Sequence, residues 1–192
     1  MRYPNSTKTF HKVISHANRG MILEELINEA NKYYYENDIA LIFKKPTPIG
    51  IVNVKTEGSK KTITKAYFKE PSTLDYNGVY KGHYIEFDAK ETKSKTSFPI
   101  ANISNNQLQH LKKVINHNGI AFLIISMNKK YYLLKAENIL KFISEESRKS
   151  IPLLFIEKNG FVINSKGLIK INYIEKLDKI IGGCQNEITK IS

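Results

Sequence analysis

The sequence predicts an α/β domain in which helices flank a mixed central sheet. Segments with helical spacing of apolar residues alternate along the chain with short segments rich in strand-forming residues. The run at residues 120–127 is apolar almost throughout, which is typical of a strand buried at the centre of a sheet. With 192 residues, 41% of them hydrophobic, the chain can bury one core, and we expect a single domain over residues 20–192.

The N-terminal part predicts a tail, a helix and a short strand. Residues 1–19 are polar and basic with little periodicity, and we expect a flexible basic tail. Apolar residues recur at helical spacing from 21 to 35, which predicts an amphipathic helix. A strand is expected at 39–43, and Pro46 and Pro48 end it because proline lacks the N–H that a sheet interior requires.

Residues 49–70 are predicted to form an extended basic β-hairpin. Its strands are expected at 49–54 and 62–68 around a tip at 56–59. Lysines interleaved with aromatic residues favour a surface that grips a phosphate backbone while its rings stack on bases. An ordinary solubilising surface is the alternative. The residues expected to contact DNA are Lys44, Lys45, Lys60, Lys61, Lys65, Tyr67 and Phe68, together with Arg19 near the N-terminus.

A second hairpin is expected to turn at Lys81-Gly82. The alternative turn, Asn77-Gly78, is the stronger hairpin dipeptide. We prefer the later turn because it leaves residues 84–89 on one long paired strand, whereas the earlier turn would break that strand at Gly82.

In this register Asp75 faces Asp88 and Thr73 faces Lys90, and side chains that alternate with period two place all four on one side of the sheet. Facing carboxylates require a compensating cation, and oxygen ligands favour Mg²⁺ or Mn²⁺. Lys90 would stabilise charge on a reacting phosphate. The pattern favours metal-dependent phosphodiester hydrolysis. A solvated sheet face is the alternative interpretation.

Ser104 begins a second helix. Gln107, three positions later, completes a capping-box pattern, and Gly119 lies in a terminating position after about Asn116. Gln107 therefore has a structural explanation, and an amide oxygen turned toward the metal is its functional alternative. The elements expected next are strands at 120–127 and 130–136 and a helix at 136–147. The remaining residues, through 169–181, are ambiguous.

The composition favours nucleic acid as the partner. Lys and Arg number 30 against 18 Asp and Glu, a net charge of +12 that is spread through loops and hairpins rather than along a membrane-binding helix. One cysteine, no secretory leader and no apolar run of 18 residues predict a cytoplasmic protein without a membrane partner. Phosphate-loop and serine-hydrolase motifs are absent, and the five histidines are scattered without ligand spacing.

Six ordered blocks of sequence carry a family likeness. Two of them hold the acidic pair, at residues 73–78 and 84–93. The others lie at 18–21, 44–48, 66–69 and 96–99. In this order they resemble the motif blocks of the RecU-type Holliday junction resolvases, over roughly residues 18–181.

The resemblance implies the restriction-endonuclease-like PD-(D/E)xK fold and a homodimeric, Mg²⁺-dependent endonuclease that cuts two strands of a four-way DNA junction during recombination and repair. Asp75, Asp88 and Lys90 would be catalytic, Lys90 as the stabiliser of the transition state. The implied metal ligands are Thr73, Asp75, Asp88 and Gln107. Mn²⁺ is an alternative cation, and recombinase or branch-migration proteins are further candidate partners. The hairpin of residues 44–70 would be the family's stalk, which projects between the junction arms.

The sequence departs from the family at one position. The family usually has glutamate where this chain has Asp88, which retracts the carboxylate by about 1.5 Å. We expect activity to survive with an altered metal preference. Two other functions stay open: a general repair or restriction-type DNA nuclease on the same fold, and a non-catalytic DNA-binding module on the same scaffold.

Overall fold

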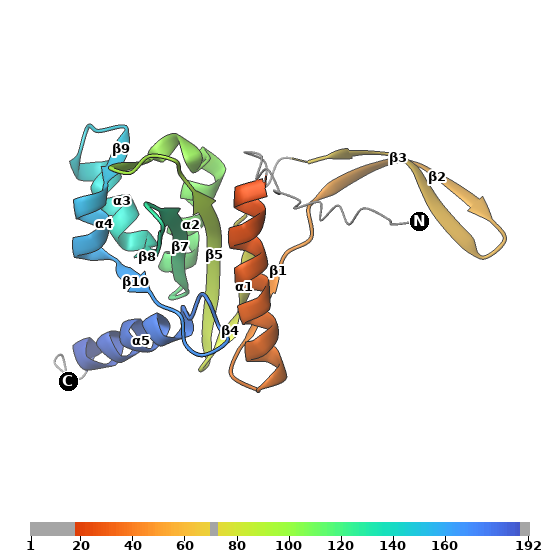
Figure 1. Ribbon diagram of the computed structural model, residues 1–192. Helices are drawn as coiled ribbons and strands as arrows, with labels where there is room; N and C mark the ends of the chain where they lie inside the picture. Colours follow the sequence, from red (N-terminus) through yellow and green to blue (C-terminus); the bar gives the residue numbers. More distant parts are fainter. Residues whose placement is uncertain (1–17, 70–72, 189–192) are drawn as a thin grey trace, which may run out of the picture.

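A six-stranded mixed sheet forms the centre of the molecule (Figure 1). The computed structural model describes residues 18–69 and 73–188, and the side chains of 22–69 and 73–182. The strands lie in the order β1 (Leu41–Lys44), β4 (Tyr76–Tyr80), β5 (His83–Glu91), β7 (Ile120–Met127), β8 (Lys130–Lys135) and β10 (Phe161–Ile163). The β5–β7 pair is parallel and its neighbours are antiparallel, which confirms the predicted mixed sheet.

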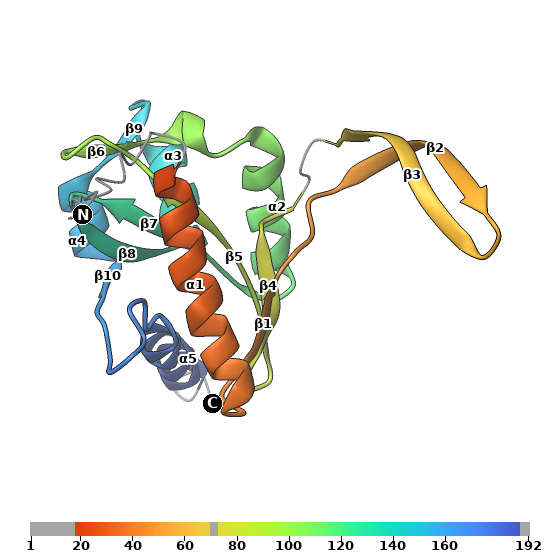
Figure 2. The ribbon, with the colours of Figure 1, turned by 45° about the vertical axis from the view of Figure 1, so that its right-hand side comes forward.

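Helices cover both faces of this sheet, as predicted (Figure 2). One face carries α1 (Asn18–Glu36) and α5 (Ile174–Ile188), and the other carries α2 (Asn105–Asn116), α3 (Ala136–Glu145) and α4 (Leu153–Asn159). On the first face Ile27, Phe87 and Leu177 share one buried core. Alternate residues of the same strands reach the opposite core, so each central strand is buried on both sides.

The hairpin of β4 and β5 turns at Lys81-Gly82, as predicted. Tyr80 pairs with His83 across the turn. Lys81 and Gly82 have φ angles of 48° and 79°, and positive φ at both central residues is the geometry of the two-residue turn that suits twisted strands.

The alternative turn at Asn77-Gly78 is excluded, because both residues lie within β4. Gly78 has a different role: a Cβ atom there would lie only 1.9 Å from the carbonyl oxygen of Leu41. The glycine therefore allows β1 to approach β4 closely, and β1 forms the edge of the sheet.

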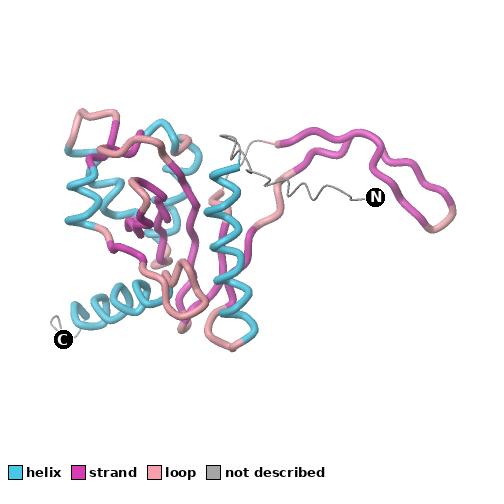
Figure 3. The backbone as a smooth tube through the Cα atoms, viewed as in Figure 1, coloured by secondary structure: helices cyan, strands magenta, loops and turns pink. Residues whose placement is uncertain are grey.

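A long hairpin projects away from the central sheet (Figures 1 and 3). Its strands, β2 (Ile49–Glu57) and β3 (Lys60–Phe68), form a separate two-stranded sheet and are longer than predicted. The register shifts around Asn53, which indicates a β-bulge. Apart from the glycine at position 50, all residues of these strands are exposed, so the hairpin presents its surface rather than a core. The predicted stalk is confirmed as a structural feature.

Helix α2 has the predicted capping box. The Ser104 hydroxyl accepts from the backbone N–H of Gln107, and the Gln107 side chain accepts from the Ser104 N–H. The residue with left-handed backbone after the helix is Asn118, with a φ of 59°, rather than Gly119. Gly119 instead permits close packing, because a Cβ atom there would lie 2.6 Å from Val114 Cγ1.

The second half of the chain contains short elements that were not predicted from the sequence. A short pair of strands, β6 (Ser97–Pro99) and β9 (Ser150–Pro152), lies apart from the central sheet, and the 3-10 turn η1 (Ile100–Asn102) follows β6. The predicted strand at 130–136 and helix at 136–147 are β8 and α3, which end at Lys135 and Glu145. The last helix, α5, was not predicted.

The N-terminal boundary differs from the expected one. Helix α1 begins at Asn18, so residues 18 and 19, which the prediction placed in the tail, are helical. Residues 1–17 of the predicted tail lie outside the described residues. In the part of the chain that the structure describes, no helix is long and apolar enough to cross a membrane.

Candidate active site

Asp88 and Lys90 lie on β5 and face helix α2. Their neighbour Phe87 points the other way, into the core beneath α1. The side-chain amide of Gln107, on the first turn of α2, donates to Asp88 Oδ2, and Lys90 Nζ lies 3.0 Å from the same oxygen. Two elements therefore converge on one buried carboxylate.

Asp75 lies beside Asp88. The ladder between β4 and β5 ends where Tyr76 pairs with Phe87, so Asp75 is one residue beyond the last pair. It is nevertheless near enough for its negative charge to act on the Asp88 carboxyl group. Burial, together with the charge of Asp75, raises the pKa of Asp88 to about 6 against the opposing effect of Lys90. The two acids thus meet on one side of the sheet.

One oxygen of this pair has no partner. Asp88 is 0% exposed, and its Oδ1 atom is buried without a hydrogen bond. A buried carboxylate oxygen left unpaired is costly, which points to a ligand that the described residues do not supply.

A divalent cation fits this oxygen. Asp75 and Asp88 offer the hard oxygen ligands that Mg²⁺ and Mn²⁺ prefer. Among the described residues, no group of three or more His, Cys, Asp or Glu side chains is placed to hold a metal. The two carboxylates would therefore share the ion with neutral oxygens and water, as Mg²⁺ sites commonly do.

Gln107 serves the helix cap and the acidic site together. Its Oε1 accepts from the Ser104 N–H at 3.1 Å, and its Nε2 donates to Asp88. The cap therefore occupies the oxygen that would bind a metal directly, and the amide holds the orientation of Asp88. The capping explanation is confirmed. The role of Gln107 as a metal ligand through its amide oxygen stays a prediction.

Two substitutions separate these contributions. Ser104→Ala removes the cap hydrogen bond from the Gln107 N–H and leaves the contact to Asp88, so it should lower the free energy of unfolding by about 1 kcal/mol and bind a divalent cation as the parent does. Gln107→Ala removes the other cap hydrogen bond and the contact to Asp88, so it should lose similar stability and also bind the cation more weakly. Urea titrations and calorimetric titrations with Mn²⁺ measure the two effects. Equal cation affinities of the two variants would contradict a role for Gln107 beside Asp88.

Thr73 is a predicted ligand that has only a local partner. Its hydroxyl lies 3.4 Å from the carbonyl oxygen of Leu74, and it is half-buried. Within residues 73–182, no hydrogen bond joins it to Asp75 or Asp88. Its role as a ligand stays a prediction.

Most of the residues predicted to contact DNA lie on the exposed hairpin. Phe68 is 80% exposed. The ring of Tyr67 lies over Gly50, because a Cβ atom added to Gly50 would be 2.3 Å from Tyr67 Cζ. The exposed lysines of β3 are Lys60, Lys61 and Lys65.

Two lysines of the predicted DNA-binding set are paired with carboxylates. Lys44 Nζ contacts Glu24 of α1, and Lys45 Nζ contacts Glu86 of β5. The first pair gives Glu24 a structural role. The side chain of Arg19 lies outside the described residues.

A buried polar cluster that was not predicted from the sequence lies next to the acids. Glu86, 1% exposed, lies two residues before Asp88 and on the same side of β5. Its carboxylate meets Lys45, the hydroxyl of Tyr84 at 2.9 Å and His110 Nε2 at 2.9 Å. Burial alone would raise the pKa of Glu86, but Lys45, the nearby His110 and the Tyr84 hydroxyl hold it below its usual value. The spacing of three between Gln107 and His110 on α2 was the available signal.

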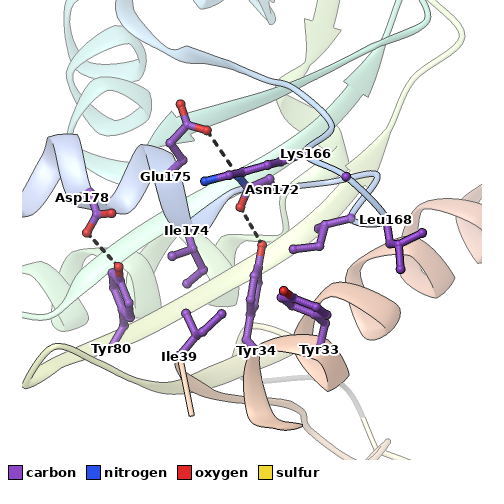
Figure 4. A pocket seen from close by; sticks show the side chains of 12 residues that line it. Tyr33, Tyr34, Ile39, Tyr80, Lys166, Leu168, Asn172, Ile174, Glu175 and Asp178 are labelled. Atoms are coloured by element: carbon purple, nitrogen blue, oxygen red, sulfur yellow. Dashed lines mark hydrogen bonds between the residues drawn. The ribbon is translucent and has the colours of Figure 1, made fainter. Parts of the chain in front are cut away.

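A separate cavity of about 450 Å³ lies on the α1 and α5 face, away from the acids (Figure 4). Tyr34, Tyr80 and Ile174 form part of its wall. Its polar groups bond to one another: Tyr80 donates to Asp178 at 2.7 Å, and Tyr34 lies 3.2 Å from Asn172 Oδ1. The cavity contributes nothing to the acidic site.

Comparison with known proteins gives consistent matches. The family model described as "RecU: Recombination protein U" matches residues 18–179. "Holliday junction resolvase RecU" from Bacillus cereus (strain B4264) is 46% identical over 195 residues, covering 94% of this chain and 98% of that protein. Its namesake from Bacillus mycoides (strain KBAB4) is 45% identical with the same coverage.

Among solved structures, the chain is similar to Archaeoglobus fulgidus Hjc, described as a Holliday junction resolvase from an archaeal hyperthermophile. The sequence identity is 9% and the TM-score 0.43, over 76% of this chain and 92% of that one. This likeness is too remote to add to the description of the fold or the site.

Proposed function

The chain belongs to the RecU family of recombination proteins, and from this membership we propose that it is a Holliday junction resolvase, an endonuclease that hydrolyses phosphodiester bonds in four-way DNA junctions. The observation that carries the proposal is the meeting of Asp75 and Asp88 beside Lys90, with one buried Asp88 oxygen unpaired. This is the set of groups that metal-dependent phosphodiester hydrolysis requires.

The proposed chemistry assigns each group one task. Asp75 and Asp88 would hold the cation, with Gln107 orienting Asp88 and Thr73 a further ligand. When bound, a divalent cation supplies an acidified water and screens the charge of the phosphate. Lys90, 20% exposed on its side chain, can leave Asp88 for a phosphate oxygen and stabilise the charge that builds up there as the bond between phosphorus and the leaving oxygen breaks.

Mg²⁺ is the proposed cation, with Mn²⁺ as an alternative. Both are hard ions that bind carboxylate and water oxygens, and the described site offers no thiolate that would select zinc. The shorter acid at Asp88 bears on this choice, because it changes the space left for the ion. Cleavage assays with each ion in turn decide it.

The proposed assembly is a homodimer, because resolution of a junction requires two cuts in symmetry-related strands and a two-fold dimer presents two equal sites. Recombinase and branch-migration proteins are proposed as further partners, and the cytoplasm as the compartment. Sedimentation at micromolar concentration tests the dimer.

The hairpin of β2 and β3 is proposed to grip the junction. Each lysine that contacts a phosphate contributes about 0.9 to the slope of log affinity against log salt concentration. Replacing Lys60, Lys61 and Lys65 together by alanine should therefore lower that slope by about 2 to 3 and weaken junction binding at every salt concentration. Binding is measured without divalent metal, so that no cleavage interferes.

The control variant loses the same number of charges. In it, alanine replaces three exposed lysines far from the hairpin: Lys141, Lys158 and Lys179. Its salt slope should equal that of the parent. Equal slopes for the hairpin variant and the parent would contradict a grip by these lysines.

The test of the proposed function compares a mobile four-way junction with a linear duplex of the same sequence, each with Mg²⁺ and with chelator. A resolvase cuts the junction, in paired symmetric positions, and spares the duplex. Equal cleavage of both substrates would identify a general repair or restriction-type nuclease. Metal-independent binding without cleavage would identify a DNA-binding module on the same scaffold.

A further inference from the structure

Lys45 connects the base of the hairpin to the acidic site through two contacts. It is the first residue after β1, where the chain leaves the sheet for the hairpin. Its backbone N–H donates to the carbonyl oxygen of Asp75 at 2.7 Å, and its ammonium contacts Glu86. Lys45 thus contacts the backbone of Asp75 and the side chain of Glu86, which lies on the same strand as Asp88.

The partner of Lys45 is fixed more firmly than a surface carboxylate. Glu86 is 1% exposed and also meets Tyr84 and His110, so it is held from β5 and from α2. The Lys45 side chain is 24% exposed. Moving its ammonium to a DNA phosphate would leave a buried carboxylate with fewer donors, which is strongly unfavourable.

The neighbouring residue, Lys44, makes a more exposed ion pair than Lys45 does. Lys44 points to the opposite face of the sheet and pairs with Glu24, where both side chains are more than one third exposed. That pair can open to solvent at little cost. The two consecutive lysines therefore hold the base of the hairpin from both faces of the sheet, and the firm contact is the one on the side of the acids.

We propose that Lys45 is a positioning residue: with Glu86 it fixes the base of the hairpin to β5 and so holds Asp75 in place beside Asp88. This inference rests on the proposed function for its effect on cleavage. It reassigns Lys45 from the DNA-contacting set to the support of the active site. Partners that orient metal-binding groups typically change activity or metal affinity about 10- to 100-fold when they are removed.

The first test separates positioning from DNA contact. Lys45→Met should reduce the single-turnover cleavage rate at saturating protein about 10- to 100-fold, while the junction Kd stays within about twofold and the salt slope stays unchanged. Lys60→Met, at the tip of the hairpin, should lower the salt slope by about 1. Lys158→Met, which changes an exposed lysine of α4 outside both sets, should leave the rate, the Kd and the slope unchanged. Lys45→Arg should recover most of the rate, because it restores a cation to Glu86.

A second measurement needs neither metal nor substrate. Amide hydrogen exchange of the free protein should be faster in residues 41–45 and 73–80 of Lys45→Met than of the parent, and unchanged in those segments for Lys60→Met. Glu86→Gln should resemble Lys45→Met in both measurements, and the double variant should be no slower in cleavage than the slower single variant, because the two changes break one contact.

A lower salt slope with a normal saturated rate for Lys45→Met would overturn the proposal and return Lys45 to the DNA-contacting set. So would unchanged hydrogen exchange in both segments. A parent protein that cleaves no junction would refute the proposed function instead, and the exchange experiment would still decide whether Lys45 holds Asp75.

Discussion

Lys90→Ala should reduce the rate of junction cleavage by about 100- to 1000-fold, the loss typical when one donor to a charged transition state is removed. The Lys90 ammonium contacts Asp88 Oδ2 at 3.0 Å. Its side chain is largely buried, so it contributes little to the surface that meets DNA. Junction binding should therefore change by less than about threefold, and rate and affinity are measured on the same preparation.

The matched control is Lys158→Ala, an exposed lysine on α4, which should leave both quantities unchanged. A cleavage rate for Lys90→Ala within a few-fold of the parent would contradict the role of Lys90. Loss of binding in proportion to loss of cleavage would make it a DNA contact instead.

Asp88→Asn should abolish cleavage and at the same time stabilise the metal-free protein. The Asp88 carboxylate is buried with one oxygen unpaired, and burial together with Asp75 raises its pKa from 3.8 to about 6. Asparagine keeps the shape without the charge. The free energy of unfolding at pH 7 should rise by on the order of 2 to 3 kcal/mol, since each pKa unit corresponds to about 1.4 kcal/mol.

The difference in free energy of unfolding between Asp88→Asn and the parent should depend on pH. Below about pH 4 the carboxyl group is protonated in the folded and the unfolded state, so the variant and the parent should be equally stable. Between pH 4 and 6 the unfolded chain releases the proton first, and the parent loses stability relative to the variant. Above pH 6 the difference should be constant. Urea titrations in chelator at several pH values measure it.

Asp178→Asn serves as the control of opposite sign. Burial raises the pKa of Asp178, but hydrogen bonds from Lys81 and Tyr80 outweigh burial and hold it below its usual value. Its charge therefore stabilises the folded state at neutral pH, and the asparagine variant should be less stable there. An Asp88→Asn protein less stable than the parent at pH 7 would contradict the claim that the buried Asp88 charge, beside Asp75, destabilises the metal-free protein.

Much of this fold follows from local sequence rules. The Lys81-Gly82 turn and the period of two placed Asp88 and Lys90 on one side of β5, and the capping box placed Gln107 at the start of α2. These features depend on neighbours within a few residues. The projecting hairpin was predictable for the same reason.

Contacts between distant segments were not predictable. Lys45 and Glu86 are 41 positions apart, and nothing in either segment marks the other as its partner. His110 appeared as a scattered histidine because its partner lies on a strand rather than at ligand spacing on its own helix. The C-terminal helix α5 was not predicted because it is stabilised mainly by packing its apolar residues into the core that α1 and the sheet also form.

The most direct measurement is a crystal structure of the protein soaked with Mn²⁺, with diffraction recorded at a wavelength where manganese scatters anomalously. An anomalous peak in contact with the carboxylates of both Asp75 and Asp88, and missing from Asp88→Asn crystals, is the predicted result. Carboxylates that bind no ion under these conditions, or an ion held elsewhere while Asp88 Oδ1 stays unpaired, would contradict the proposal that these two acids form the catalytic metal site.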